Sequence, residues 1–120
     1  MKWVSLICVV LIVALLIYLF PVIKICGDSM YPTLNDGDII LGCRLCKSFK
    51  KKRVYVYRPP EQGKRYFVIK RLTHISRDTG KLFFEGDNSD YSYDSRMYGY
   101  ISPKKVIARY VFTIYKKKGV

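Results

Sequence analysis

The sequence predicts an all-β fold, with a small antiparallel β domain behind one N-terminal transmembrane helix. Three observations support this prediction: an uninterrupted apolar run at the N-terminus, a series of short β-rich segments separated by turn signals, and the lack of a useful helical period in the rest of the chain. With 120 residues, the chain has room for one small domain, and a two-domain enzyme is excluded.

The N-terminal segment is long enough to cross a bilayer. Residues 3–23 contain no charged side chain, and about 20 apolar residues span the roughly 30 Å of hydrocarbon in a membrane. A removable signal peptide would carry small residues just after its apolar core, and residues 21–26 offer none. We therefore expect an uncleaved anchor over residues 1–24, followed by one domain over residues 25–120.

The basic residues are concentrated after the anchor. Of the 22 Lys and Arg residues only Lys2 precedes Lys24, the last residue of the anchor, and the whole chain has nine acidic residues. Basic clusters stand at residues 50–53 and 116–118. They could bind nucleic acid, bind anionic lipid head groups, or simply be solvated loops. A membrane tether favours the last two interpretations over nucleic-acid binding. The positive-inside rule leaves the span unoriented, because Lys2 and the amino terminus oppose only Lys24 and Arg44.

Five segments of the domain have the pattern of β-strands. Each is rich in β-branched or aromatic residues, and they cover residues 38–41, 53–58, 66–72, 81–85 and 106–115. Clusters of Asn, Asp, Gly and Pro, which preset or tolerate turn dihedrals, stand at residues 35–38, 59–63 and 77–80. This spacing is typical of hairpins in a small antiparallel sheet.

The cysteines do not predict a metal site. Cys43 and Cys46 are spaced C-x-x-C, but there is no second such pair, and the single His74 cannot complete a set of zinc ligands. The pair is open to a local disulfide in an oxidising compartment and to free thiols in a reducing one. We expect neither a metal ion nor an organic cofactor.

The most informative segment is residues 26–41. In it Ser29 follows Gly-Asp and precedes a Pro-Thr pair, and a turn then leads into a predicted strand. The segment resembles the nucleophile region of bacterial type I signal peptidases, and the self-cleaving repressor proteases of phage and DNA-damage responses carry a similar Gly-Asp-Ser-Met-x-Pro run. Both families look like Ser/Lys hydrolases, so the resemblance implies that Ser29 is a nucleophile served by a lysine base.

Lys70 is the candidate base. It lies in the third predicted strand, where period-two alternation places it on the same face as Val68 and Leu72. Desolvation among apolar neighbours lowers the pKa of a lysine and leaves a neutral amine able to take the Ser29 proton. The alternative is a lysine that snorkels to the surface, whereas the adjacent Arg71 is permanently charged and cannot act as a base.

A third segment distinguishes the two families. Residues 86–99 run Gly-Asp-Asn, then Ser-x-Asp-Ser-Arg, then Gly, which resembles a block of the signal peptidases that the repressor proteases lack. The resemblance implies that Ser92 hydrogen-bonds to the lysine and aims it, and that Asp94 and Arg96 form a supporting ion pair. The Ser29 backbone N–H is the expected oxyanion donor, but the hydroxyl that some members add two residues earlier is replaced here by Gly27.

The resemblance implies a serine endopeptidase with a single membrane span, located in the plasma membrane with its Ser/Lys domain on the extracytoplasmic side. Such an enzyme removes signal peptides from exported preproteins after a small-x-small motif through an acyl-enzyme. Its expected partners are these preproteins and membrane lipid, with anionic head groups favoured, and not nucleic acid. Two alternatives stay open: a maturation protease dedicated to one partner, such as a pilin or a secreted peptide, and an inactive relative acting as an assembly factor.

Overall fold

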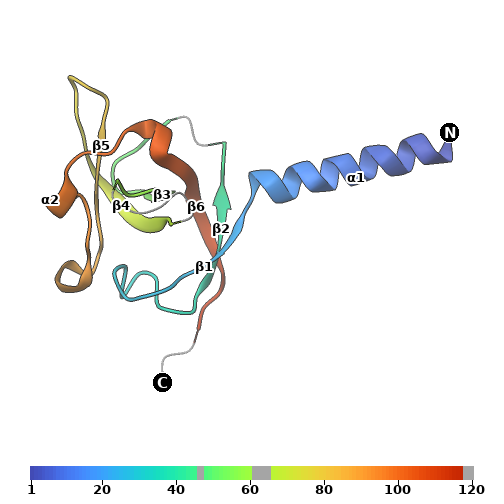
Figure 1. The fold of residues 1–120 in the computed structure, drawn as a ribbon. Helices are drawn as coiled ribbons and strands as arrows, with labels where there is room; N and C mark the ends of the chain where they lie inside the picture. The colour runs from blue at the N-terminus through green and yellow to red at the C-terminus, as the bar shows by residue number, and fades with distance from the viewer. Residues whose placement is uncertain (46–47, 61–65, 118–120) are drawn as a thin grey trace.

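A computed structural model describes residues 1–45, 48–60 and 66–117. Six strands form one antiparallel sheet in the order β1-β2-β6-β3-β4-β5, and helix α1 projects away from it (Figure 1). This architecture confirms a small antiparallel β domain behind an apolar N-terminal helix. The all-β description is approximate, because the short helix α2 (Ser95–Tyr98) and two 3-10 turns lie between the last two strands.

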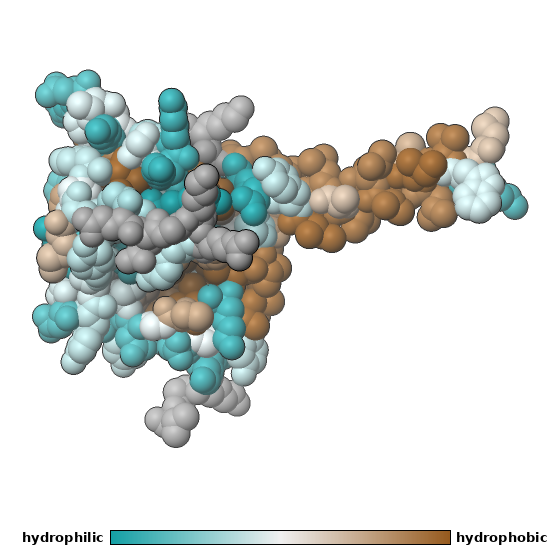
Figure 2. Space-filling model, viewed as in Figure 1, coloured by the Kyte–Doolittle hydropathy of each residue, from teal (hydrophilic) through white to brown (hydrophobic). Residues whose placement is uncertain are grey.

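Helix α1 (Lys2–Leu19) has the length and the composition needed to cross a membrane, and none of its residues is buried against the domain. Figure 2 shows hydrophobic residues along almost its whole length, whereas the surface of the domain is more hydrophilic. The helix ends before the apolar run does, because a proline at position 21 disfavours the helical conformation at Phe20, which has φ −123° and ψ 75°.

The chain after Pro21 forms strand β1 (Val22–Lys24), which pairs with β2 at one edge of the sheet. The sequence did not predict this strand, since its first two residues continue the apolar run of the anchor. The five predicted strands are confirmed with small shifts at their ends: β2 (Ile39–Cys43), β3 (Val54–Tyr57), β4 (Val68–Ile75), β5 (Leu82–Glu85) and β6 (Val106–Tyr115). The turn predicted at residues 59–63 lies partly outside the described residues.

Strand β3 is buried on both faces and separates two hydrophobic clusters. One face carries Tyr55 and Tyr57, which pack with Leu72, Leu82, Phe84 and Ile101. The ring of Tyr57 stacks on Phe84 at a centroid distance of 4.3 Å. The other cluster consists of Ile25, Met30, Leu34, Ile40 and Val54. Because Met30 and Leu34 belong to it, the loop that carries the predicted nucleophile is part of the core.

The end of β6 is fastened to this loop by the fully buried carboxylate of Asp38. Asp38 accepts hydrogen bonds from Asn35 N at 2.9 Å, Lys116 Nζ at 2.8 Å and Lys117 N at 2.9 Å. Burial alone would raise the pKa of Asp38, but these donors outweigh burial and hold the pKa below its usual value. The sequence placed Lys116 in a possible lipid-binding cluster, but its ammonium group is paired with Asp38 of the same domain. Lys118 of that cluster lies outside the described residues.

We predict that Asp38→Asn lowers the free energy of unfolding at pH 7 by about 1 to 3 kcal/mol. The change removes the charge that pairs with half-exposed Lys116, and it places the NH2 group of the Asn side chain next to groups that are themselves hydrogen-bond donors. The lowered pKa makes this contribution complete above the unfolded pKa of about 3.9, and it is lost as the pH falls through the folded value. Urea unfolding of the full chain in detergent micelles measures both effects. A loss no greater than that of Asp78→Asn, at an exposed turn residue, contradicts the prediction.

Candidate active site

Ser29 lies on the loop that joins β1 to β2. Gly27 has φ of +91°, a conformation that L side chains rarely adopt, and its N–H donates to Asp36 Oδ1 at 2.8 Å. The side chains of Met30 and Leu34 are buried just after the serine and anchor the loop to the core. The loop thus presents the half-buried Ser29 hydroxyl from a backbone that is held on both sides.

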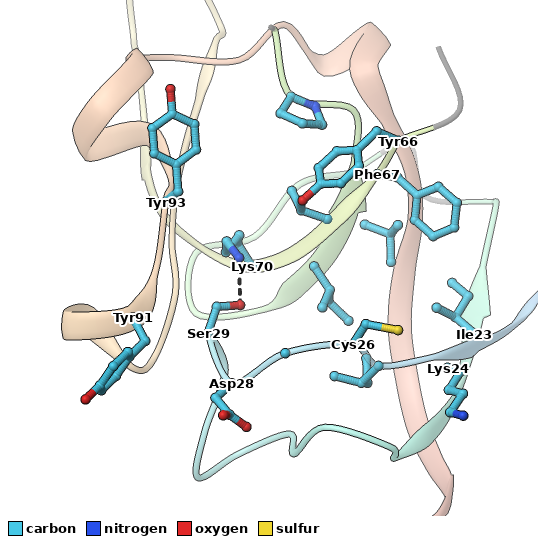
Figure 3. A pocket seen from close by; sticks show the side chains of 16 residues that line it. Ile23, Lys24, Cys26, Asp28, Ser29, Tyr66, Phe67, Lys70, Tyr91 and Tyr93 are labelled. Carbon is cyan, nitrogen blue, oxygen red and sulfur yellow. Dashed lines mark hydrogen bonds between the residues drawn. The ribbon is translucent and has the colours of Figure 1, made fainter. Parts of the chain in front are cut away.

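Lys70 reaches Ser29 from strand β4. Its side chain is 5% exposed, and Nζ lies 2.7 Å from Ser29 Oγ (Figure 3). Leu72 belongs to the hydrophobic cluster around Tyr55 and Tyr57, and Val68 packs against that cluster. The apolar neighbours that alternation predicted for Lys70 are therefore confirmed. The structure therefore brings together two side chains that are 41 residues apart in the sequence, and Lys70 does not snorkel to the surface.

The environment of Lys70 makes its amine easy to deprotonate. Burial lowers the pKa of Lys70 to about 8, and the negative charge of Asp94 opposes part of that shift. About a tenth of the molecules would therefore carry a neutral amine at pH 7, and about half at pH 8. In that state the nitrogen lone pair can accept the proton of the Ser29 hydroxyl across the same hydrogen bond.

Asp94 and Arg96 form the ion pair that the resemblance implied. The fully buried Asp94 carboxylate accepts from Arg96 Nε at 3.0 Å and from Arg96 Nη2 at 2.8 Å, and it caps helix α2 by accepting from Arg96 N at 3.1 Å. Gly86 N donates to the same carboxylate at 2.8 Å. Burial raises the pKa of Asp94, but the bonds from Arg96, Ser92 and Gly86 lower it to about 2.

Ser92 differs from the sequence prediction in its hydrogen-bond partner. Its hydroxyl donates to Asp94 Oδ2 at 2.5 Å, and the described part of the chain contains no hydrogen bond between Ser92 and Lys70. A carboxylate is a stronger acceptor than an amine, so the buried Asp94 attracts the hydroxyl proton. Ser92 is therefore linked to the base only indirectly. It binds Asp94, whose negative charge raises the pKa of Lys70.

A second ion pair joins the three segments of the site. Arg71, adjacent to Lys70, donates from Nε and Nη2 to the two oxygens of Asp87, each at 2.8 Å. Thr33, four residues after Ser29, donates to Asp87 Oδ2 at 2.5 Å. Sequence reasoning missed this link, because it gave Arg71 no role beyond its exclusion as a base.

The Gly-Asp-Asn block also holds the Ser29 backbone directly. Asn88 N donates to the Ser29 carbonyl oxygen at 2.8 Å, and Asn88 Nδ2 donates to the Asp28 carbonyl oxygen at 3.0 Å. A side chain on Gly86 would place its Cβ 2.6 Å from the Ser29 carbonyl oxygen, so only glycine fits there without displacement. Sequence reasoning quoted these residues without giving them a role, although their position in a matching block was a signal.

A cavity of about 510 Å³ opens beside the Ser29 hydroxyl (Figure 3). Most of its wall is apolar and comes from β1, β3 and β4, with Ile23, Ile25, Val56, Val68 and Ile69 among the lining residues. Tyr66, Phe67, Tyr91 and Tyr93, all exposed, add an aromatic margin. The apolar wall and the aromatic margin therefore lie next to the Ser29 hydroxyl.

Cys43 and His74 are not among the residues that line the cavity beside Ser29. His74 is exposed, and its ring packs against Phe83 in a T-shaped arrangement. Cys43 is a buried free thiol, and Cys46 lies outside the described residues, so the state of that predicted pair is not tested. Cys26, an exposed free thiol, lines the cavity.

Comparison with known proteins finds a family model that matches almost the whole chain. The family model described as "Signal peptidase, peptidase S26" matches residues 1–78 and 73–115. Among curated proteins, mitochondrial inner membrane protease subunit 1 of Schizosaccharomyces pombe is 34% identical over an alignment of 118 residues, gaps included, and the match covers 77% of this chain and 74% of that protein.

We predict that the Lys70 amine titrates with a midpoint near pH 8, below the value of about 10.4 for a model lysine, because it is buried. Competitive acetylation of the full chain by acetic anhydride, read by mass spectrometry across pH, gives the midpoint for each lysine. Asp94→Asn should move the Lys70 midpoint lower, because it removes the charge that raises the pKa. A short lysine peptide in the same reaction is the control, and a Lys70 midpoint equal to that of the peptide contradicts the prediction.

Proposed function

The chain belongs to the signal peptidase family S26, and on that premise we propose that it is a membrane-bound serine endopeptidase with Ser29 as nucleophile and Lys70 as general base. The observation that carries the proposal is the 2.7 Å contact between the buried Lys70 amine and the Ser29 hydroxyl. A lysine held beside a serine hydroxyl, with a pKa lowered to about 8 by burial, has both the geometry and the protonation behaviour of a base.

The proposed reaction has two halves. Neutral Lys70 takes the proton of Ser29 while Oγ attacks the carbonyl carbon of the scissile bond, and the Ser29 backbone N–H stabilises the oxyanion. The Lys70 ammonium then gives its proton to the departing amine, and an acyl-enzyme remains. Lys70 next deprotonates a water molecule that attacks the ester, and the return of the proton to Ser29 Oγ restores the enzyme.

Ser92, Asp94 and Arg96 have supporting roles in this proposal. The guanidinium of Arg96 pairs with the Asp94 carboxylate, which moderates the negative charge near Lys70 and keeps the base deprotonatable. The Ser92 hydroxyl fixes the orientation of the same carboxylate. These three residues then tune and position the base without touching the substrate.

We further propose that residues 1–24 are the anchor and that residues 25–120 are the peptidase domain, on the extracytoplasmic side of the plasma membrane. The substrates are exported preproteins, cut after a small-x-small motif, for which the cavity beside Ser29 provides an apolar wall. Membrane lipid is the second partner, since the basic residues 50–53 are all exposed on a domain tethered to the bilayer.

The mitochondrial relative favours a second candidate, which is the same chemistry on preproteins at a mitochondrial inner membrane. Cell fractionation of the full chain, followed by protease protection of the domain, separates the two locations. A dedicated maturation protease predicts cleavage of one partner only, so a panel of unrelated preproteins with small-x-small sites tests it. An inactive assembly factor predicts no covalent labelling of Ser29 by an acylating inhibitor.

We predict that Ser29→Ala and Lys70→Ala each lower preprotein cleavage by about 1,000-fold or more, and that the double variant is no worse, because nucleophile and base act as one unit. The assay uses the full chain in vesicles and a preprotein with a small-x-small site. Ser89→Ala and Lys81→Ala, at exposed positions, are the matched controls. Substantial activity in either single variant at the site contradicts the Ser/Lys mechanism.

We also predict that kcat/KM rises with pH and reaches half its plateau near pH 8, because only the neutral form of Lys70 accepts the serine proton. Below pH 7 the rate should fall about tenfold for each pH unit. Rates on one peptide from pH 5.5 to 10 give the profile. A rate that does not change between pH 6 and 9 would exclude Lys70 as the titrating base.

A further inference from the structure

The junction between α1 and the sheet is short and is hydrogen-bonded on both sides. Only Phe20 and Pro21 separate the helix from β1. The Pro21 carbonyl oxygen accepts from Gly42 N on β2 at 2.8 Å, and β1 itself pairs with β2. The sheet is therefore fixed up to Pro21, and the angle of α1 depends on what holds the last turn of the helix.

Arg44, the residue that follows β2, holds that last turn through three contacts. Its N–H donates to the Leu19 carbonyl oxygen at 2.8 Å, and its Nε donates to the Tyr18 carbonyl oxygen at 2.7 Å. Its guanidinium carbon lies 4.9 Å from the centroid of the Tyr18 ring. We call these three contacts the Arg44 brace.

The brace matches the chemistry of a helix C-terminus. The last carbonyl groups of a helix lack partners inside it and carry partial negative charge, so a cation is stabilising there. The last turn of α1 contains no basic residue of its own, and Arg44 supplies the cation from the sheet. Tyrosine is enriched at the membrane interface, where its ring also attracts a cation.

We propose that Arg44 is a positioning residue that sets the angle between α1 and the sheet, and through it the height above the bilayer at which Ser29 meets a substrate. The proposal rests on the proposed function. A substrate whose own apolar segment lies in the same bilayer presents successive residues at increasing heights. The height of Ser29 then selects the bond that is cut, so Arg44 acts as a determinant of cleavage position.

The magnitude is large enough to matter. Pro21 and Ser29 are eight residues apart, so the arm between the junction and the nucleophile is at most about 28 Å. A pivot of roughly 20° at the junction would move Ser29 by up to about 10 Å, which is about three residues of an extended substrate. Loss of the brace should therefore shift or broaden the cleavage position by about one to three residues.

The first arm of the test measures position without catalysis. The full chain, with a fluorescent amino acid in place of exposed Met97 on α2, is reconstituted in phosphatidylcholine vesicles that contain acceptor-labelled lipid. Arg44→Ala should broaden the distribution of donor lifetimes, because the domain samples more heights. Arg44→Lys, which keeps the charge without the planar guanidinium, should lie between Arg44→Ala and wild type. Arg77→Ala, at an exposed turn arginine, should match wild type.

The second arm measures the bond that is cut. Membrane-anchored substrates carry overlapping small-x-small sites at successive distances from their apolar segment, and mass spectrometry identifies the product ends. Wild type and Arg77→Ala should cut at one dominant position, and Arg44→Ala at several or at a shifted one. On a soluble peptide in detergent, Arg44→Ala should keep kcat/KM within about twofold of wild type, because Arg44 does not touch the site.

The outcomes separate this proposal from the proposed function. Unchanged donor lifetimes in Arg44→Ala overturn the brace, and changed lifetimes with an unchanged cleavage position overturn its role in choosing the bond. If wild type cuts no substrate, the proposed function fails, while the lifetimes still decide whether Arg44 sets the height of the domain. Should Arg44→Ala unfold in a thermal scan, Tyr18→Leu replaces it, since it removes the ring and leaves the backbone acceptor in place.

Discussion

Burial of the Lys70 amine against Ser29 is the constraint on which the rest of the site depends. An ammonium group that is almost completely removed from water is costly unless it is paired with a carboxylate or loses its proton. Two carboxylates of the described site are already paired with arginines, Asp94 with Arg96 and Asp87 with Arg71. Each arginine stays protonated, whereas burial lowers the pKa of Lys70 to about 8, so the lysine is the cation that loses its proton most easily.

This arrangement asks for a rigid nucleophile loop, because a neutral amine on a flexible stem is useful only when the serine stays within hydrogen-bond reach. The loop is fixed at several points that do not share a segment. Met30 and Leu34 enter the core, Asn88 bonds to the Ser29 carbonyl oxygen, and Thr33 bonds to Asp87. Asp38, at the end of the same loop, binds Lys116, which directly follows β6. Segments from both halves of the chain therefore hold the Ser29 loop in place.

Local patterns explain what the sequence predicted. Alternation and turn signals located five strands, and the apolar neighbours of Lys70 predicted its burial. The missed features depend on partners that are remote in the sequence, such as the Asp38–Lys116 and Arg71–Asp87 pairs. The partner of Ser92 was mistaken for a related reason: the competition between the Asp94 carboxylate and the Lys70 amine is decided only when the two are placed in three dimensions.

Strand β1 shows why membrane geometry and site geometry are not independent in so small a chain. Its first two residues continue the apolar run of the anchor, yet the strand pairs with β2 and forms part of the sheet. Ile23 and Lys24 of the same strand line the cavity beside Ser29. The chain that continues from α1 is thus also a wall of the candidate site, so one short strand joins the membrane helix to the cavity.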